Sequence, residues 1–326
     1  MPRAGRLDAP GVMQHIMIRG IERRNIFRDD TDREEFLARL ARLLPETQTA
    51  CYAWALLPNH VHLLLRTGAA PLPTLMRRLL TGYAVRFNRR HKRHGLLFQN
   101  RYKSVVCQED RYFAELVRYI HLNPLRAKLV ADMKELSKYP YCGNSAIMGN
   151  VATEWQNTKY VLELFNEKMS LARLRYREFM QKGIDIGRRP DLTGGGLIRS
   201  VGGWSAVKSL RKSGAYQKGD ERILGDGEFV EKVLSQAEEG YENKYRLKAK
   251  GVDVSRIAER VAEITGMTPE AVWTSGKQPQ AVLARSILCY WATCELGPGM
   301  AEQEAGAFPG SGEPFRNKGA SDSITI

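Results

Sequence analysis

Hydrophobic residues in the first part of the chain recur with two spacings, one typical of strands and one typical of helices. Short apolar or alternating runs, which predict β-strands, cover residues 12–19, 51–57, 60–66 and 100–107. Apolar residues three or four positions apart, which predict amphipathic helices, cover residues 28–44, 72–92 and 110–123. The first six segments give the βαββαβ order of a ferredoxin-like or RRM-like α+β sheet. The last helix is extra, and we expect it to lie against that sheet.

Turn and capping residues separate these segments. Gly20 ends the first predicted strand, and Pro58 with Asn59 forms a turn between the second and third strands. The polar residues from Asp30 to Asp32 can cap the first helix. Pro124 ends the last helix, because a residue that precedes proline avoids the helical conformation.

The pattern changes after residue 130. Helical spacing returns over residues 153–182 and 255–296, and in the second stretch Thr268 can cap a helix that begins at Pro269. Between them, residues 185–204 are rich in glycine, as in a linker or a pair of loops. We therefore predict four parts: a sheet domain (1–131), a helical extension with a glycine-rich linker (132–206), a mainly helical domain (207–296) and a disordered tail (297–326).

Composition narrows the class of protein. The chain has 326 residues, of which 43% are hydrophobic, so a sizeable core can form. It shows no readable signal peptide and no apolar run long enough to span a membrane. Its five cysteines lack C-x-x-C spacing. We expect a cytoplasmic protein with reduced thiols, no zinc site and no membrane contact.

The charge of the chain is strongly positive. The net charge is +14 and the pI is about 9.6, which indicates a polyanionic partner. Residues 47–108 contain no Asp or Glu. The positive residues of this block are Arg66, Arg77, Arg78, Arg86, Arg89, Arg90, Lys92, Arg93, Arg101 and Lys103. Since an idle soluble surface mixes both signs, the block favours contacts with nucleic-acid phosphates.

Two histidines flank one valine in the third predicted strand, as "HVH" at residues 60–62. Side chains two residues apart on a strand point to the same face, so His60 and His62 project together while Val61 points into the core. Two neighbouring imidazoles on an open sheet surface could hold a divalent metal ion. The spacing by itself also fits two solvent-facing histidines without a ligand.

The last predicted helix offers partners for such a site. Tyr119 and Asn123 are four residues apart and share one helical face, whereas His121 points elsewhere. A tyrosine can attack a phosphate and hold DNA as a phosphotyrosine, and an amide oxygen can bind a hard cation. Spacing does not separate Tyr119 from three rival tyrosines, which are Tyr83, Tyr102 and Tyr112.

These motifs resemble the HUH single-tyrosine transposases, and most of all their REP-associated tyrosine transposase branch. The resemblance is carried by "HIMIRGIERRNIF", "PNHVHLLLRT", "LMRRLLTGYAVRFNRRHKRHGLLFQNRYKS" and "RYIHLNPLRAKLV", in the family's order over about residues 2–131. It implies an enzyme that cleaves and rejoins single-stranded DNA at hairpins with magnesium or manganese as cofactor. It also implies a cytoplasmic, nucleoid-associated protein that acts as a monomer or a homodimer.

The resemblance implies a role for each residue of the candidate site. His60 and His62 would be metal ligands, Asn123 the third ligand and Tyr119 the nucleophile. Attack would leave a 5′-phosphotyrosine and a free 3′-hydroxyl, and a second 3′-hydroxyl would reverse the step. No nucleotide is consumed, which agrees with the lack of a G-x-x-x-x-G-K-[ST] phosphate loop in the sequence.

The hairpin would then lie on the positive block. The candidate DNA-binding residues are Arg19, Arg23, Arg24, Arg77, Arg78, Arg86, Arg89, Arg90, Lys92, Arg93, Arg101, Tyr102 and Lys103. Three aromatic rings could stack on unpaired bases: Tyr83, Phe98 and Tyr102.

The C-terminal region carries a second resemblance. "RIAERVAEITGMTPEAVW" and "KQPQAVLARSILCYWATCELG" look like the start of the DNA-binding domain of the bacterial replication initiator DnaA. At Leu296 a tail rich in glycine and proline replaces the expected recognition helix. This region is therefore either a DNA-binding domain without that helix or an accessory helical bundle.

Three other functions fit part of these observations. A non-catalytic DNA-binding protein that grips repetitive palindromes would keep the fold and the charge, but it would not need both histidines and Tyr119. A replication-initiator or relaxase nuclease commonly places its histidine motif differently relative to the tyrosine. An RRM-like RNA-binding protein would leave the histidine pair without a role.

Overall fold

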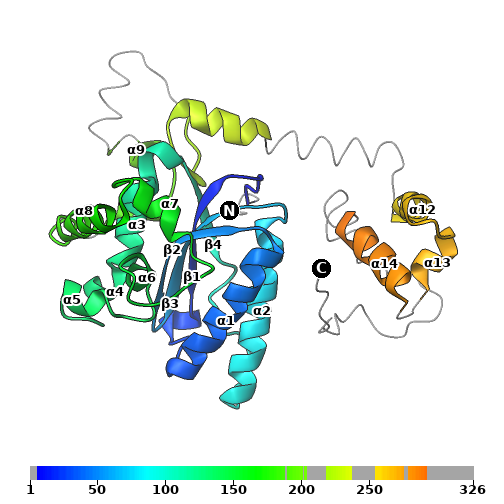
Figure 1. Cartoon of the computed structure of the whole chain (residues 1–326), viewed down its shortest axis with the longest axis horizontal. Helices are drawn as coiled ribbons and strands as arrows, with labels where there is room; N and C mark the ends of the chain where they lie inside the picture. The colour runs from blue at the N-terminus through cyan, green and yellow to red at the C-terminus, as the bar shows by residue number, and fades with distance from the viewer. Residues whose placement is uncertain are drawn as a thin grey trace. The chain divides into compact units, whose positions relative to one another are not determined.

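The computed structural model describes residues 6–187, 189–200, 202–203, 218–236, 254–274 and 278–291. The chain divides into two compact units, Met1–Ala237 and Glu238–Ile326. In the first unit, helices cover both faces of a sheet (Figure 1). Its first elements are β1 (Met13–Arg19), the 3-10 turn η1 (Ile21–Arg23), α1 (Asp30–Glu46), β2 (Ala50–Leu57), β3 (His60–Arg66), α2 (Leu72–Arg90), β4 (Lys103–Cys107), α3 (Glu109–His121) and α4 (Asn123–Arg126).

The strand order confirms the α+β prediction. The strands lie in the order β2-β3-β1-β4-β5, and β1 pairs antiparallel with both β3 and β4. Without β5, this is the order of a ferredoxin-like βαββαβ sheet. The predicted extra helix is α3, which contacts β2 and β3.

One face of the sheet packs against α1 and α2. Ile16, Ile18, Val61 and Leu63 are fully buried there. The helices supply buried residues at helical spacing: Phe36, Leu40, Leu43, Leu75, Leu79 and Tyr83. We call this the aliphatic face. Burial of these side chains, at about 25 cal/mol per Å² of apolar surface, is the main force that holds α1 and α2 to the sheet.

The opposite face packs against α3 and the helical extension, and we call it the histidine face. Met13 and Leu64 share a buried cluster with residues of α3 and α8. The extension contains α5 (Met133–Leu136), α6 (Asn144–Ile147), α7 (Thr158–Glu163), α8 (Met169–Gln181), the 3-10 turn η2 (Pro190–Thr193) and α9 (Leu197–Ser200). Figure 1 shows α3, α7 and α8 across the sheet from α1 and α2. Both faces of the sheet are therefore covered.

Two predicted features differ from the structure, the cap of α1 and the start of β4. Asp29, rather than residues 30–32, caps α1 by accepting a hydrogen bond from the Asp32 amide at 3.1 Å. β4 begins at Lys103 rather than at residue 100, because Asn100 has a left-handed φ of 59° that a strand does not allow. The predicted end of the last helix before Pro124 is confirmed, because α3 ends at His121 and Pro124 belongs to the separate helix α4. That residue lies in the first turn of α4, where a proline breaks no hydrogen bond.

Part of the predicted glycine-rich linker packs onto the sheet unit. Leu192 is fully buried. Gly195 donates a backbone hydrogen bond to Glu221 at 3.0 Å, and a Cβ on Gly195 would lie 2.2 Å from the Ile223 carbonyl oxygen. Only glycine therefore fits at this close approach.

The boundary predicted at residue 207 also needs correction. β5 (Ile223–Leu224) pairs parallel with β4, and a helix over 227–236 contributes Val230 and Val233 to a cluster with Val106. Residues 218–236 therefore belong to the sheet unit rather than to the C-terminal helical region. A two-residue strand has no periodicity, so the hydrophobic pattern could not indicate it.

The described residues of the second unit form three helices, α12 (Val254–Thr265), α13 (Pro269–Trp273) and α14 (Pro279–Trp291), around one apolar cluster. The predicted cap is confirmed: the Thr268 side chain accepts from the Ala271 amide, and Pro269 is the first residue of α13. The predicted tail and the expected position of the missing recognition helix lie outside the described residues. Among the helices of the described ranges, none is long and apolar enough to cross a membrane.

Candidate active site

The end of β1 and the start of β3 bring the candidate residues together. In the antiparallel register, Arg19 lies opposite His60 and Met17 lies opposite His62. Residues paired in this way point to the same face of the sheet, here the histidine face. We call the end of the sheet where β1 ends and β3 begins the histidine end.

The two histidines are adjacent but do not lie on an open surface. Their ring centroids are 5.2 Å apart. His62 is only 5% exposed, and His60 is partly buried. Burial, followed by the charge of Arg19, lowers the pKa of His60 to about 4, and burial holds the pKa of His62 well below its usual value. Both rings are therefore neutral at pH 7, as metal ligands must be.

Tyr119 extends from α3 against one of these histidines, His62. Its ring centroid lies 5.7 Å from that of His62, with the two planes near perpendicular. Burial raises the pKa of the Tyr119 hydroxyl, whereas the charges of Arg126 and Arg19 oppose that shift. No described residue hydrogen-bonds the hydroxyl, which leaves it open to a substrate.

The three competing tyrosines lie elsewhere. The Tyr83 hydroxyl donates to the Ile26 carbonyl, and the Tyr112 hydroxyl donates to the Ser200 carbonyl. Tyr102 is buried, and the Arg6 guanidinium lies 3.9 Å from its ring centroid. Of the four tyrosines that the spacing allowed, Tyr119 is the one with ring contacts to the histidines among the described residues.

Asn123 is the first residue of α4, one turn after Tyr119, and it is buried. Its amide Nδ2 has no hydrogen-bond partner among the described residues. An unpaired buried amide is costly. Because Nδ2 is a hydrogen-bond donor, it could donate to an acceptor such as a phosphate oxygen, whereas the atom that could bind a cation is Oδ1. Among the described residues, no three His, Cys, Asp or Glu side chains gather into a metal site.

The local hydrogen bonds fit His60 as a metal ligand. Asn59 Nδ2 donates to the Arg23 carbonyl, which turns Asn59 Oδ1 toward His60 Nδ1 at 2.6 Å. An amide oxygen only accepts, so His60 Nδ1 carries the hydrogen and Nε2 keeps its lone pair. The donor set of two imidazole nitrogens and one amide therefore suits a divalent cation such as magnesium or manganese.

His15 is a member of the cluster that the sequence interpretation missed. It is fully buried on β1, its Nε2 lies 2.9 Å from His62 Nδ1, and its ring centroid lies 5.9 Å from that of Tyr119. Its Nδ1 contacts the Leu192 carbonyl oxygen at 3.0 Å. The only signal in the sequence was a histidine inside an otherwise apolar strand, and that signal has no meaning until the strand register is known.

The sequence of this region is similar to a known protein family. Residues 9–123 match the family model described as "Transposase IS200 like". We call residues 9–123 the transposase domain after this match. The match spans His15, His60, His62, Tyr119 and Asn123 and stops before the helical extension.

Two solved structures resemble the transposase domain. One is described as a REP-associated tyrosine transposase bound to a REP hairpin: it is 15% identical, with 48% of this chain and 98% of that chain covered and a TM-score of 0.38. The other is described as a transposase of Deinococcus radiodurans R1: it is 19% identical, with 35% and 93% covered and a TM-score of 0.26. No curated protein matches the chain.

The arginines of α2 fall into two groups along the helix. Arg77 and Arg78 lie near its start, and Arg86, Arg89 and Arg90 near its end. α2 follows the far end of β3, so its last turn returns to the histidine end of the sheet. At 1.5 Å per residue, Arg77 lies roughly 18 Å along the helix from Arg89. Only the second group therefore lies toward the histidine end, on the aliphatic face of the sheet.

Several of the expected DNA contacts are engaged within the protein. Arg78 pairs with Glu46. Arg90 pairs with Asp29 at 2.8 Å and with the buried Asp32 at 2.6 Å. These side chains have less freedom to reach a phosphate than Arg86 and Arg89, which are exposed.

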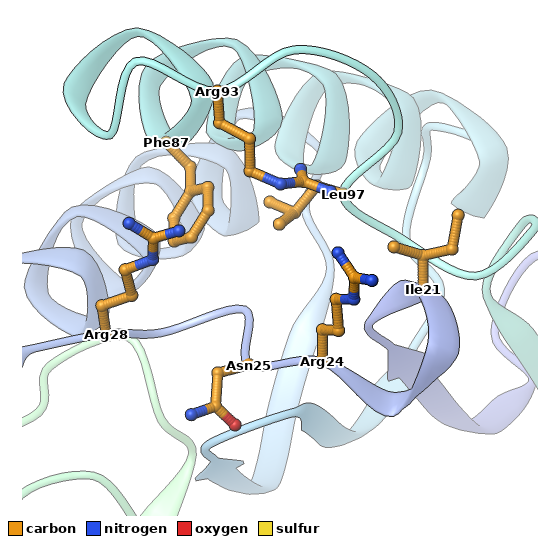
Figure 2. Close-up of a pocket in the computed structure, with 7 residues that line it drawn as sticks. All are labelled: Ile21, Arg24, Asn25, Arg28, Phe87, Arg93 and Leu97. Atoms are coloured by element: carbon orange, nitrogen blue, oxygen red, sulfur yellow. The ribbon is translucent and has the colours of Figure 1, made fainter.

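A pocket of about 270 Å³ opens at the histidine end of the transposase domain. It is lined by Ile21, Arg24, Asn25, Arg28, Phe87, Arg93 and Leu97. Figure 2 shows Arg24 and Arg93 extending toward each other from opposite sides, with Arg28 beside the Phe87 ring. Residues 24–28, which form one wall of the pocket, contact the turn before His60. The Ile26 amide donates a hydrogen bond to the Pro58 carbonyl at 2.8 Å. The pocket and the histidines therefore both lie at the histidine end of the sheet.

Proposed function

We propose that this protein cleaves and rejoins single-stranded DNA at hairpin sequences through a covalent 5′-phosphotyrosine on Tyr119. The observation that supports this most is the contact of the Tyr119 ring with His62, which brings a nucleophile and a metal-ligand pair together from two distant elements. A structural tyrosine would instead satisfy its hydroxyl within the protein, as Tyr83 and Tyr112 do.

The proposed step forms one bond and breaks one. The Tyr119 oxygen, after losing its proton, attacks the phosphorus of the scissile linkage. The bond from phosphorus to the 3′ oxygen breaks, and that oxygen takes a proton to become the 3′-hydroxyl. In the reverse step another 3′-hydroxyl attacks the phosphotyrosine and releases Tyr119.

The residues around Tyr119 lower the cost of the negative charge in this step. The Arg126 guanidinium lies 5.4 Å from the Tyr119 ring, and Arg19 favours the phenolate as well. Arg19 is exposed at the end of β1, opposite His60, where it would meet the scissile phosphate. A divalent cation held by His60, His62 and Asn123 would polarise that phosphate.

The pocket at the histidine end would receive the DNA strand next to the cleaved linkage. Arg24, Arg28 and Arg93 offer cations for a phosphate, and the Arg28 guanidinium lies 5.7 Å from the Phe87 ring centroid. Arg86 and Arg89, exposed near the end of α2, would continue this positive path. Tyr83 and Tyr102 do not present open ring faces, which leaves the partly exposed Phe98 as the stacking candidate.

One gel experiment tests the proposal. End-labelled single-stranded hairpins from the DNA around the gene are incubated with the protein, with and without magnesium or manganese, and separated on a denaturing protein gel. We expect a metal-dependent covalent band that Tyr119→Phe abolishes and that Tyr139→Phe, a tyrosine of the extension, retains. Tight binding to the same hairpins without any band would instead support a non-catalytic DNA-binding protein.

A further inference from the structure

A buried chain of hydrogen bonds links the helical extension to His62. The Leu192 carbonyl oxygen lies 3.0 Å from His15 Nδ1, and His15 Nε2 lies 2.9 Å from His62 Nδ1. The two rings are stacked with centroids 5.2 Å apart. The strand register allows this contact because His15 and His62 are diagonal neighbours across β1 and β3 on one face.

The chemistry of these groups permits one order of donors and acceptors. A carbonyl oxygen only accepts, so His15 Nδ1 must carry a hydrogen. A neutral imidazole carries one hydrogen, so His15 Nε2 is an acceptor. His62 Nδ1 must then donate to it, which leaves His62 Nε2 without a hydrogen.

The neutral state of both rings follows from their surroundings. His15 is completely buried, and no described carboxylate contacts either ring, so a cation there would be desolvated and unpaired. A positively charged His15 would donate from both nitrogens. The single hydrogen of a neutral His62 would then sit on Nε2, and that atom could not bind a metal ion.

We propose that His15 is a positioning residue that holds the hydrogen of His62 on Nδ1, and that the Leu192 carbonyl holds His15 in turn. The inference rests on the proposed function in one respect, which is that His62 is a metal ligand. Neutral histidine in water favours the hydrogen on Nε2, so this chain of hydrogen bonds selects the less favoured form. Asn59 imposes the same form on His60, and the two histidines therefore offer matched Nε2 lone pairs.

The segment that orients His15 is η2, which lies outside residues 9–123, the region that matches the family model. Leu192 belongs to η2 and is fully buried, and the next carbonyl along, that of Thr193, accepts from Lys103 Nζ at 2.6 Å. These two contacts fasten η2 across β1 and β4. Lys103, which we also expect to bind DNA, contacts the segment that orients His15.

The direct test is the position of the hydrogen on His62 in the full-length protein without metal. Protein labelled with ¹⁵N-histidine is studied by two-bond ¹H–¹⁵N correlation spectra, with His62 assigned from His62→Gln. We expect Nδ1 to show the protonated type of shift and Nε2 the unprotonated type. The reverse pattern in the unmodified protein would overturn the proposal without the need for any variant.

Substitutions at His15 test its role. His15→Phe keeps an aromatic ring but removes both nitrogens. We therefore expect a larger fraction of His62 to carry its hydrogen on Nε2. We also expect the Kd for Mn²⁺, measured without DNA from the signal of the free ion, to rise about 10–100-fold. His15→Gln can donate to Leu192 and accept from His62, and should therefore recover much of both properties. If folded His15→Phe, checked by circular dichroism, keeps the His62 pattern and the Mn²⁺ affinity, the proposal is wrong.

A matched pair of leucines tests the contribution of the extension. Leu192 and Leu162 are both buried in the same cluster, but only Leu192 presents a carbonyl to His15. Both alanine variants should lose stability, whereas only Leu192→Ala should disturb the His62 pattern. Equal effects would mean that the segment acts through packing alone.

The two proposals can fail separately. If His62 carries its hydrogen on Nδ1 and binds Mn²⁺, but no covalent DNA band forms, the strand-transfer function is wrong and the positioning role stands. If the Tyr119 band forms while His15→Phe leaves His62 unchanged, the function stands and the positioning role is wrong.

Discussion

The aliphatic face and the histidine face belong to the same strands and are both buried, yet they are held by different interactions. Val61 and Leu63 pack against α1 and α2 through apolar contact alone. Their neighbours on the other side of β3, His60 and His62, make directed hydrogen bonds to Asn59 and His15. Apolar contacts tolerate small adjustments, whereas a hydrogen bond to a ring nitrogen requires one geometry and one position of the hydrogen. Burial on the histidine face therefore orients the imidazole rings as well as stabilising the fold.

The largest contrast is expected between His60 and Leu63, two residues of β3 that point to opposite faces of the sheet. His60→Ala should reduce covalent capture at least about 100-fold with little effect on unfolding, since the side chain is partly exposed and its loss removes a ligand. Leu63→Ala should lower the free energy of unfolding by about 2–5 kcal/mol, but leave capture per folded molecule unchanged. Urea unfolding and the gel assay measure the two effects.

A smaller effect is expected from Arg19 on the rim of the histidine face. Arg19→Ala should slow covalent capture about 100-fold, because one cation beside the scissile phosphate is lost. Arg42→Ala changes an exposed arginine of α1 outside the candidate site and serves as the control. Single-turnover rates with saturating hairpin measure both variants, and equal rates for the two would contradict the position we assign to Arg19.

The pocket arginines should affect binding rather than chemistry. Arg28→Ala should weaken hairpin affinity a few-fold and reduce the slope of log K against log salt by about one. Arg42→Ala, an exposed residue of α1 outside the pocket, should leave both unchanged. Filter binding at several salt concentrations gives the slopes.

The smallest effect is expected at the start of α2. Arg77 is exposed but lies at the far end of the helix from the histidines. Arg77→Ala should therefore change hairpin affinity by less than about twofold, whereas Arg89→Ala should weaken it more. Equal losses in a binding titration would show that the DNA covers the whole of α2.

The hydrophobic pattern was sufficient for most of the fold. Period-two and period-3.6 spacing located the four main strands and three long helices, and the parity of "HVH" placed both histidines on one face. It failed where a short element lacks periodicity, as for β5, and where backbone conformation decided a boundary, as at Asn100. It also suggested an open face for the histidines, because no local signal shows that the extension folds back over the sheet.

The sequence by itself determined the βαββαβ order, the pairing of His60 with His62 on one face and the positive charge of the chain. Only the tertiary structure decided that Tyr119, and not Tyr83, Tyr102 or Tyr112, meets those histidines. It also brought Leu192 to His15 across 177 positions and His15 to His62 across 47. The physical reason is that periodicity reports which side of an element is buried, whereas the position of a hydrogen on an imidazole depends on the one atom that faces each nitrogen.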